Sequence, residues 1–349
     1  MKKYLIILAM CVLGSSCSKD LLKEEPKVPT SATFYNTAND LSLATTGLHA
    51  LNNVAFNQVA GWATCYGGDD AGVARIGNKI SFSDFDTFQP NSSNDRMTNW
   101  WGSFYNTIKS CNSMLLNYAK AAASETEKNN AAGQAYFLRA LSYFFLTRTW
   151  GAIPLTTDNS VDYARAKAQP SEVYNLIVSD LQKAETMLPD SWSGAGVQFQ
   201  NGVNVAPTKG SAKAMLANVY LTMAGWPLKQ TDKYALAAAK AKEVMDQKAT
   251  YNVDLLNNFA DLWKKENQYN NEAVFACYFN NKVPNTPWNQ WNILGPNSSQ
   301  PGDEGGWDDW FGEISFYNAF PAGPRKDATY QSTYIVGGAA KDWTGTALK

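Results

Sequence analysis

Apolar residues recur at helical spacing through the middle of the chain. Between residues 99 and 118 they are separated by three, four or seven positions, which places them on one face of a helix: Trp101, Phe104, Tyr105, Ile108 and Leu115. Residues 130–150 are apolar nearly all round, which predicts a helix buried at the centre of the molecule. Gly151 and Pro154 follow directly, as expected where a helix ends.

Three further segments continue this pattern. Residues 173–188 carry an apolar side chain every three or four positions and are closed by Pro189. Thr208 precedes a regular apolar series at residues 212–223 and is predicted to cap that helix. Residues 234–244 predict a fifth helix, rich in alanine. Small residues on these faces allow close helix–helix contact, which suggests a tetratricopeptide-like stack of antiparallel pairs, although the chain shows no clean repeat period.

Two segments lack the helical pattern. Residues 57–95 and 282–312 contain glycine and proline among aromatic and acidic residues. Long irregular segments in a compact domain are usually functional or disordered, and the tryptophan content of the second segment argues against disorder. We therefore expect an all-α, mostly helical protein whose long loops bind the ligand.

The N-terminus predicts export and a lipid anchor. Two lysines precede residues 4–13, which are mostly apolar but too few to span a bilayer. The small residues that follow lead to Cys17 and resemble a bacterial lipobox, in which cleavage leaves a lipidated cysteine. An ordinary signal peptide with an incidental cysteine is the alternative. We expect a signal peptide over 1–16, a lipidated tether over 17–30 and a helical domain over 31–349.

Charge and cysteine content narrow the function. Lysine and arginine number 30 against 31 acidic residues, so no basic excess exists to bind a nucleic acid. A single histidine, His49, leaves little room for a metal site or for chemistry based on a histidine base, and we expect no cofactor. Removal of the signal and lipidation of Cys17 leave Cys65, Cys111 and Cys277, an odd set without CxxC spacing. Cys111 lies on an apolar helical face and is predicted to be a buried, inert thiol.

The aromatic residues indicate a binding protein. The chain contains 12 Trp and 17 Tyr, whose flat apolar faces and polar edges suit amphipathic ligands. A glycan site combines such rings with amide and carboxylate groups, and the loops offer these candidates: Trp288, Asn289, Trp291, Trp307, Asp308, Trp310, Trp62, Asp69 and Asp70. The alternative for each loop tryptophan is that it packs the loop onto the helices. Trp100 and Trp101 are expected in the core.

An enzyme is the competing class. Acidic residues in one loop could supply the two carboxylates of a glycoside hydrolase: Asp303, Glu304, Asp308, Asp309 and Glu313. Clustered acids in a loop are more often solvated, and their spacing matches no calcium loop. Arg139 and Arg148 lie within the central helix and are expected to form structural pairs rather than to act in catalysis. We expect no enzymatic activity.

A family resemblance emerges from the central helix. Residues 133–144 (GQAYFLRALSYF) and the following turn at 149–155 (TWGAIPL) resemble the hallmark of the SusD/RagB family. Further similar segments follow in the family's order: 165–188, 208–221, the strand-like 271–275 (NEAVF) and 325–330 (RKDATY), the last with Gly323 and Pro324 where the family usually has its aspartate. Family members normally continue well beyond this point, so the resemblance implies that a C-terminal part is missing.

The resemblance carries its own expectations. It implies a helical fold with tetratricopeptide-like units, and an outer-membrane lipoprotein exposed at the cell surface. The charged residues behind Cys17 resemble the surface-export signal of Bacteroidetes lipoproteins. The family also implies a SusC-like TonB-dependent transporter as partner, to which the protein delivers an oligosaccharide. A peptide-binding, RagB-like receptor is the alternative; the aromatic content favours sugar, because a peptide site needs a strand edge or deep apolar pockets.

Overall fold

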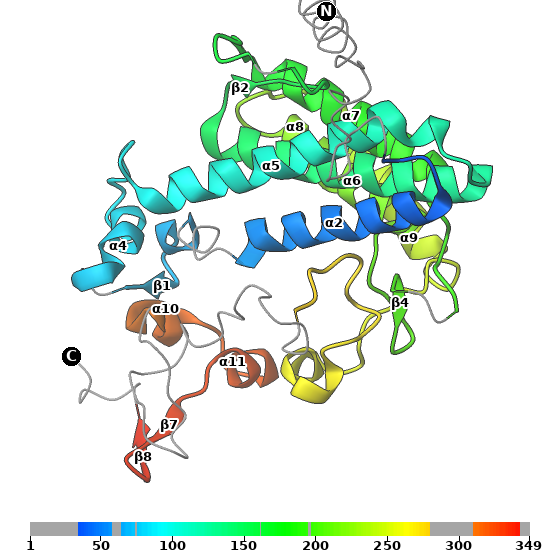
Figure 1. Cartoon of the computed structure of the whole chain (residues 1–349). Helices are drawn as coiled ribbons and strands as arrows, with labels where there is room; N and C mark the ends of the chain where they lie inside the picture. Colours follow the sequence, from blue (N-terminus) through cyan, green and yellow to red (C-terminus); the bar gives the residue numbers. More distant parts are fainter. Residues whose placement is uncertain are drawn as a thin grey trace, which may run out of the picture.

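Helices dominate the computed structural model, which describes residues 34–57, 64–73, 75–160, 162–194, 197–279 and 310–342 (Figure 1). The longer helices are α2 (Ala38–Asn57), α5 (Asp95–Asn117), α6 (Glu125–Trp150), α7 (Pro170–Met187), α8 (Lys209–Ala224) and α9 (Lys233–Asp246). From α5 to α9 each helix packs on the next, and α2 packs on α5 and α6. The predicted mostly helical class is confirmed.

Shorter elements connect and flank this stack. The short helices are α4 (Ile80–Asp86), α10 (Ile314–Ala319), α11 (Pro324–Thr329) and the 3-10 turns η2 (Thr64–Gly67), η3 (Gly77–Lys79), η4 (Tyr118–Lys120), η5 (Phe259–Trp263) and η6 (Lys265–Asn267). Four antiparallel strand pairs join β1 (Ala71–Gly72) to β6 (Phe311–Gly312), β2 (Ile153–Pro154) to β3 (Lys167–Ala168), β4 (Phe199–Gln200) to β5 (Val203–Asn204), and β7 (Thr333–Val336) to β8 (Ala339–Asp342). No helix in the described ranges is long and apolar enough to cross a membrane.

Side-chain caps fix where the helices begin. The Thr208 hydroxyl accepts a hydrogen bond from the Ser211 backbone N–H, so the predicted cap of α8 is confirmed. Helix α6 begins at Glu125, five residues before the apolar pattern starts. There Ser124 and Glu127 form a capping box, in which each side chain bonds the other residue's backbone N–H.

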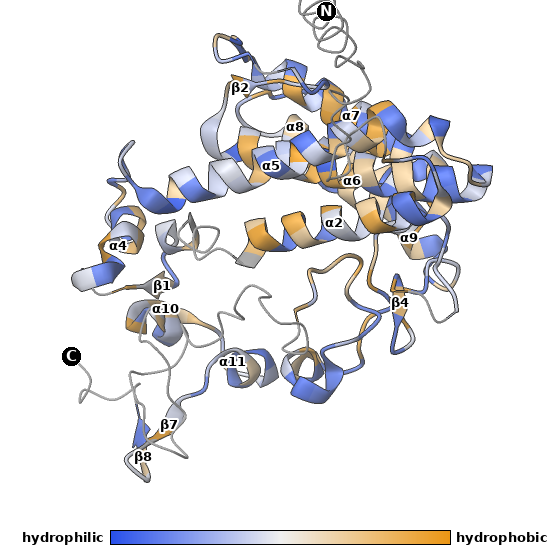
Figure 2. Ribbon diagram, in the orientation of Figure 1, coloured by the Kyte–Doolittle hydropathy of each residue, from blue (hydrophilic) through white to orange (hydrophobic). Residues whose placement is uncertain are grey.

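The core is centred on α6, as its sequence predicts. Phe137 and Leu138 are essentially inaccessible to solvent, and so is Phe104 on the facing side of α5. Trp100 is buried, whereas Trp101 packs half-buried at the core's edge. Figure 2 shows hydrophobic colour gathered along the helices of the stack. Cys111 is fully buried, as predicted, and burial raises the pKa of its thiol.

Several local expectations are wrong. The sequence pattern assigned no helix to α2, because two of the five residues on its buried stripe are polar: Leu41, Thr45, Leu48, Asn52 and Ala55. Segment 57–95, expected to be irregular, contains α4. Residues 271–275 form no strand; instead Phe275 packs edge-on against Phe137 at 4.9 Å. Arg148 is exposed and lies over the Phe144 ring at 5.0 Å rather than in a buried ion pair.

Candidate functional site

A short strand pair joins two of the segments that the sequence nominated separately. Ala71 pairs with Gly312 and Gly72 with Phe311, so β1 and β6 run antiparallel. The Glu313 backbone N–H extends this ladder by donating to the Asp70 carbonyl oxygen at 3.0 Å. The exposed acidic pair Asp69–Asp70 therefore lies next to residues 311–313, which follow Trp310 in the chain. We call this region the β1–β6 junction.

Close contact at the junction depends on a glycine. A Cβ atom on Gly72 would clash with the Glu313 carboxylate and lie 3.2 Å from the Phe311 ring. A larger residue at position 72 would therefore force the Glu313 and Phe311 side chains to move.

Trp310 lies half-buried beside this junction. Its ring centroid is 4.7 Å from that of Tyr66, with the planes tilted by 45°. Trp310 and Met97 pack against a second, smaller core separate from the helical stack: Tyr66, Val73, Phe82 and Phe85. Trp310 thus helps to hold this loop region together while part of its surface stays accessible.

Tyr317 on α10 and Tyr330, directly after α11, form a further aromatic cluster. Tyr330 packs edge-on against Tyr317 at 5.1 Å and against Phe320 at 5.7 Å. The Lys326 ammonium lies 4.0 Å above the Tyr317 ring. Burial and then the negative charge of Asp70 raise the pKa of Tyr330. The sequence analysis missed these rings, although aromatic residues at 316, 317 and 320 carry a helical spacing.

The other predicted residues cannot be placed on this surface. Trp288, Asn289, Trp291, Trp307, Asp308, Trp62 and the lipidation residue Cys17 lie outside the described residues. Among the residues that are described, the structure brings the segment of Asp69 and Asp70 and the segment of Trp310 to one junction, where the two flank opposite ends of the short strand pair. No group of three or more histidine, cysteine, aspartate or glutamate side chains within these ranges could hold a metal ion.

Comparison with known proteins identifies the family. Residues 28–221 match a family model described as starch-binding and associating with the outer membrane, SusD-like. The chain belongs to the SusD-like family. A SusD-like protein of Bacteroides ovatus is 28% identical over 305 residues, which are 84% of this chain and 52% of that protein. SusD-like protein P2 of Formosa agariphila is 29% identical over 269 residues, covering 75% of this chain and 50% of that protein. The chain spans about half the length of these curated relatives.

Solved structures agree with this SusD-like assignment. A SusD homolog from Bacteroides thetaiotaomicron superposes with a TM-score of 0.75 at 19% identity, covering 91% of this chain and 63% of that one. A laminarin-binding SusD-like protein superposes with a TM-score of 0.56 at 26% identity, covering 67% and 50%. The helical stack is therefore the fold of the SusD-like family.

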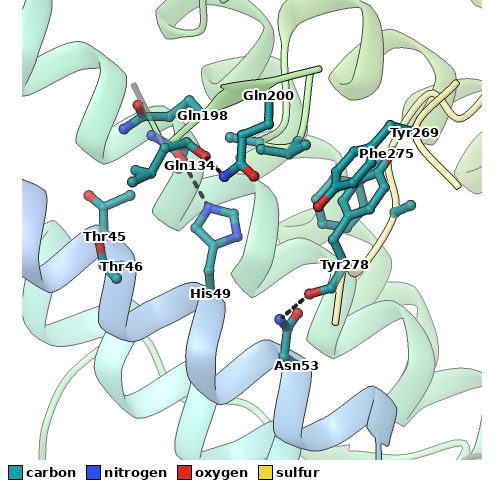
Figure 3. Close-up of a pocket in the computed structure, with 14 residues that line it drawn as sticks. Thr45, Thr46, His49, Asn53, Gln134, Gln198, Gln200, Tyr269, Phe275 and Tyr278 are labelled. Atoms are coloured by element: carbon teal, nitrogen blue, oxygen red, sulfur yellow. Dashed lines mark hydrogen bonds between the residues drawn. The ribbon is translucent and has the colours of Figure 1, made fainter. Parts of the chain in front are cut away.

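The SusD-like chain also contains a pocket that the sequence analysis did not foresee. A cavity of about 170 Å³ lies between α2, α6, the β4–β5 hairpin and residues 269–278 (Figure 3). We call it the His49 pocket; its polar lining residues are Thr45, Thr46, His49, Asn53, Gln134, Gln198, Gln200, Tyr269 and Tyr278. Thr45, His49 and Asn53 are spaced by four along α2, a signal visible in the sequence once that helix is recognised.

Gln134 holds the imidazole in this pocket. His49 Nε2 lies 2.8 Å from Gln134 Oε1, and Gln134 Nε2 donates to the Asn130 carbonyl oxygen at 3.1 Å. With its amide N–H so engaged, the glutamine accepts through oxygen, which assigns the proton to His49 Nε2. Burial lowers the pKa of His49 and outweighs the hydrogen bond to Gln134, so the ring is neutral at pH 7 with Nδ1 as an acceptor.

An aromatic pair forms the opposite wall. The rings of Tyr269 and Tyr278 stack with centroids 4.9 Å apart and planes 8° from parallel. Within the described part of the chain, the buried Tyr278 hydroxyl has no hydrogen-bond partner. Burial and then the neighbouring Tyr269 raise the pKa of Tyr278.

Proposed function

We propose that this chain is a cell-surface glycan-binding lipoprotein that captures an oligosaccharide and delivers it to a partner TonB-dependent transporter of the SusC type. The observation that carries the proposal is the β1–β6 junction, which pairs the segment that follows the half-buried Trp310 with the segment that follows the exposed acidic pair Asp69–Asp70. Aromatic rings and hydrogen-bond acceptors side by side are what a sugar requires.

The chemistry of the junction suits an oligosaccharide. The C–H face of a pyranose packs on an aromatic ring, while its hydroxyl groups donate to carboxylates at the edge. Exposed Asp69 and Asp70 supply such acceptors. The family description supports starch, and the laminarin-binding relative supports a β-glucan, so glucose polymers are the first ligands to test.

The anchor and the partner belong to the same proposal. Lipidation at Cys17 would hold the domain at the outer membrane, with the charged residues behind it as a polar tether. The description of the family as associating with the outer membrane supports this location. The remaining loop candidates would extend the same binding surface. They are Trp62, Trp288, Asn289, Trp291, Trp307 and Asp308.

Calorimetric titration of the soluble chain with starch, laminarin and xyloglucan oligosaccharides tests the proposal. Trp310→Ala, Trp288→Ala and Trp291→Ala should each weaken binding roughly tenfold, since an aromatic face contributes on the order of 1.5 kcal/mol. Trp226→Ala is the matched control, because Trp226 is 78% exposed beyond α8 and away from the junction.

Stability measurements separate ligand contact from packing. Trp310 also packs on Tyr66, so its variant should lose some thermal stability as well as affinity. Asp69→Asn changes an exposed side chain and should weaken binding roughly fivefold without altering the melting temperature. Wild-type affinity in Asp69→Asn and in all three tryptophan variants, or release of reducing ends from the bound glycan, would reject the proposal.

A further inference from the structure

We propose that the His49 pocket is a second ligand site, which holds one neutral sugar ring. The site goes beyond the glycan surface proposed above: no described residue lines both, and β4 and β1 lie at opposite ends of α2 in Figure 1. The volume of the pocket, the uncharged side chains that line its described part and the hydrogen-bonding groups left free there favour such a ligand.

The volume fits a single ring. Cavities of about 150 Å³ hold a benzene-sized molecule, and pockets for larger ligands begin at about 300 Å³. At about 170 Å³, the His49 pocket matches the volume of one six-membered ring.

The lining excludes a charged ligand. Among the described residues that line the pocket there is no aspartate, glutamate, lysine or arginine, so a charge brought into it would lose water without gaining a counter-ion from them. His49, the one basic group in the lining, is neutral at pH 7 because burial lowers its pKa. Only an uncharged ligand avoids this cost.

Both donors and acceptors face the cavity. Asn53 Nδ2 donates to the Tyr278 carbonyl oxygen at 3.3 Å and Gln200 Nε2 donates to Val197 at 3.2 Å, which leaves the two amide oxygens as acceptors. His49 Nδ1 is a third acceptor, and in Figure 3 this nitrogen faces the side of the pocket where Tyr278 lies. The Gln198 side chain, which makes no hydrogen bond to another described residue, can donate through its amide group.

This combination matches a sugar better than an apolar ring. Each sugar hydroxyl both donates and accepts, so a ring bearing several of them can satisfy such a mixed set. Leaving a buried polar group without a partner costs free energy, which opposes an apolar occupant. Tyr269, Tyr278 and Phe275 supply the apolar wall on which the ring's C–H face can lie.

The single histidine makes the test direct. In the full chain labelled with ¹⁵N-histidine, every imidazole signal belongs to His49. We expect a saturable shift of the Nδ1 resonance on titration with at least one of glucose, galactose and mannose, and no shift with glucuronate or glucosamine at pH 7. Gln200→Ala should weaken the titrating sugar roughly fivefold, because it removes one neutral hydrogen bond.

Control variants separate the outcomes. Gln182 on α7 is exposed, as Gln200 is, but does not line the pocket. Gln182→Ala should therefore leave the sugar titration unchanged. Trp310→Ala should also leave it unchanged, so failure of the junction as a glycan site would not affect this test. The proposal is overturned if none of the neutral sugars shifts the imidazole signals, if a charged sugar shifts them equally, or if Gln200→Ala behaves like Gln182→Ala.

Discussion

Arg139 and Asp180 form a two-point ion pair inside the helical stack. Arg139 Nε lies 2.7 Å from one carboxylate oxygen and Nη2 lies 2.8 Å from the other. The side chains are only 6% and 0% exposed. Arg139 Nη1 also donates to Asn112 Oδ1 at 2.8 Å, so one guanidinium joins α5, α6 and α7. The structural role predicted for Arg139 is confirmed.

Removing one partner of this pair should destabilise the protein strongly. Asp180→Ala leaves a buried guanidinium without its counter-ion, and we expect a loss of about 3–5 kcal/mol in the free energy of unfolding. The double variant Arg139→Met, Asp180→Leu should recover much of that loss, because it removes both charges from the interior. Chemical denaturation measures both; a double variant no more stable than Asp180→Ala would contradict this account.

Two helical glycines should respond to alanine in opposite directions. A Cβ on Gly210 would lie 2.7 Å from Cγ and 2.8 Å from Cβ of Tyr251, so Gly210→Ala should cost about 1–3 kcal/mol through overpacking. Gly102 on α5 has no atom within 4 Å of such a Cβ, and Gly102→Ala should add about 0.5–1 kcal/mol by restricting the unfolded chain. Melting curves of the two variants provide the comparison, and shifts of the same sign would refute it.

Stability should fall as the pH drops below the ordinary pKa of histidine. Burial lowers the pKa of His49 in the folded protein, so on acidification the unfolded chain takes up a proton first. The full stability is therefore present above about pH 6.5 and declines below it, by at most about 1.4 kcal/mol per pH unit. The decline should be weaker in His49→Gln, in which the chain has no histidine. If the free energy of unfolding changes equally with pH in the two proteins between pH 7 and pH 5, then folding does not lower the pKa of His49.

Replacing the predicted lipidated cysteine should release the protein from membranes. Cys17→Ala removes the only anchor that the sequence indicates, without touching a described residue. Membrane fractionation in cells lacking the partner transporter should find the variant in the soluble fraction with an unchanged melting temperature. Tight membrane association of Cys17→Ala under these conditions would count against the lipoprotein assignment.

The sequence determined the helical stack because its helices are encoded locally. The buried faces of α5 to α8 carry many apolar residues at helical spacing, and Thr208 marks one start by its own side chain. Helix α2 escaped prediction because Thr45 and Asn52 sit in its buried stripe, where neighbouring helices rather than hydrophobicity decide the packing. The sequence also indicated a structural role for Arg139, but only packing selected Asp180 as its partner.

The candidate sites were decided by the tertiary structure. The sequence suggested Asp69 and Asp70 in one loop and Trp310 in another as glycan-binding candidates. Only the pairing of Ala71 with Gly312 brings these two loops to one junction. The His49 pocket draws on four segments, none of which carries a motif of its own. Hydrophobic periodicity is a property of one helix and can be read along the chain. Contacts between distant segments depend on how whole elements pack, and no local pattern records them.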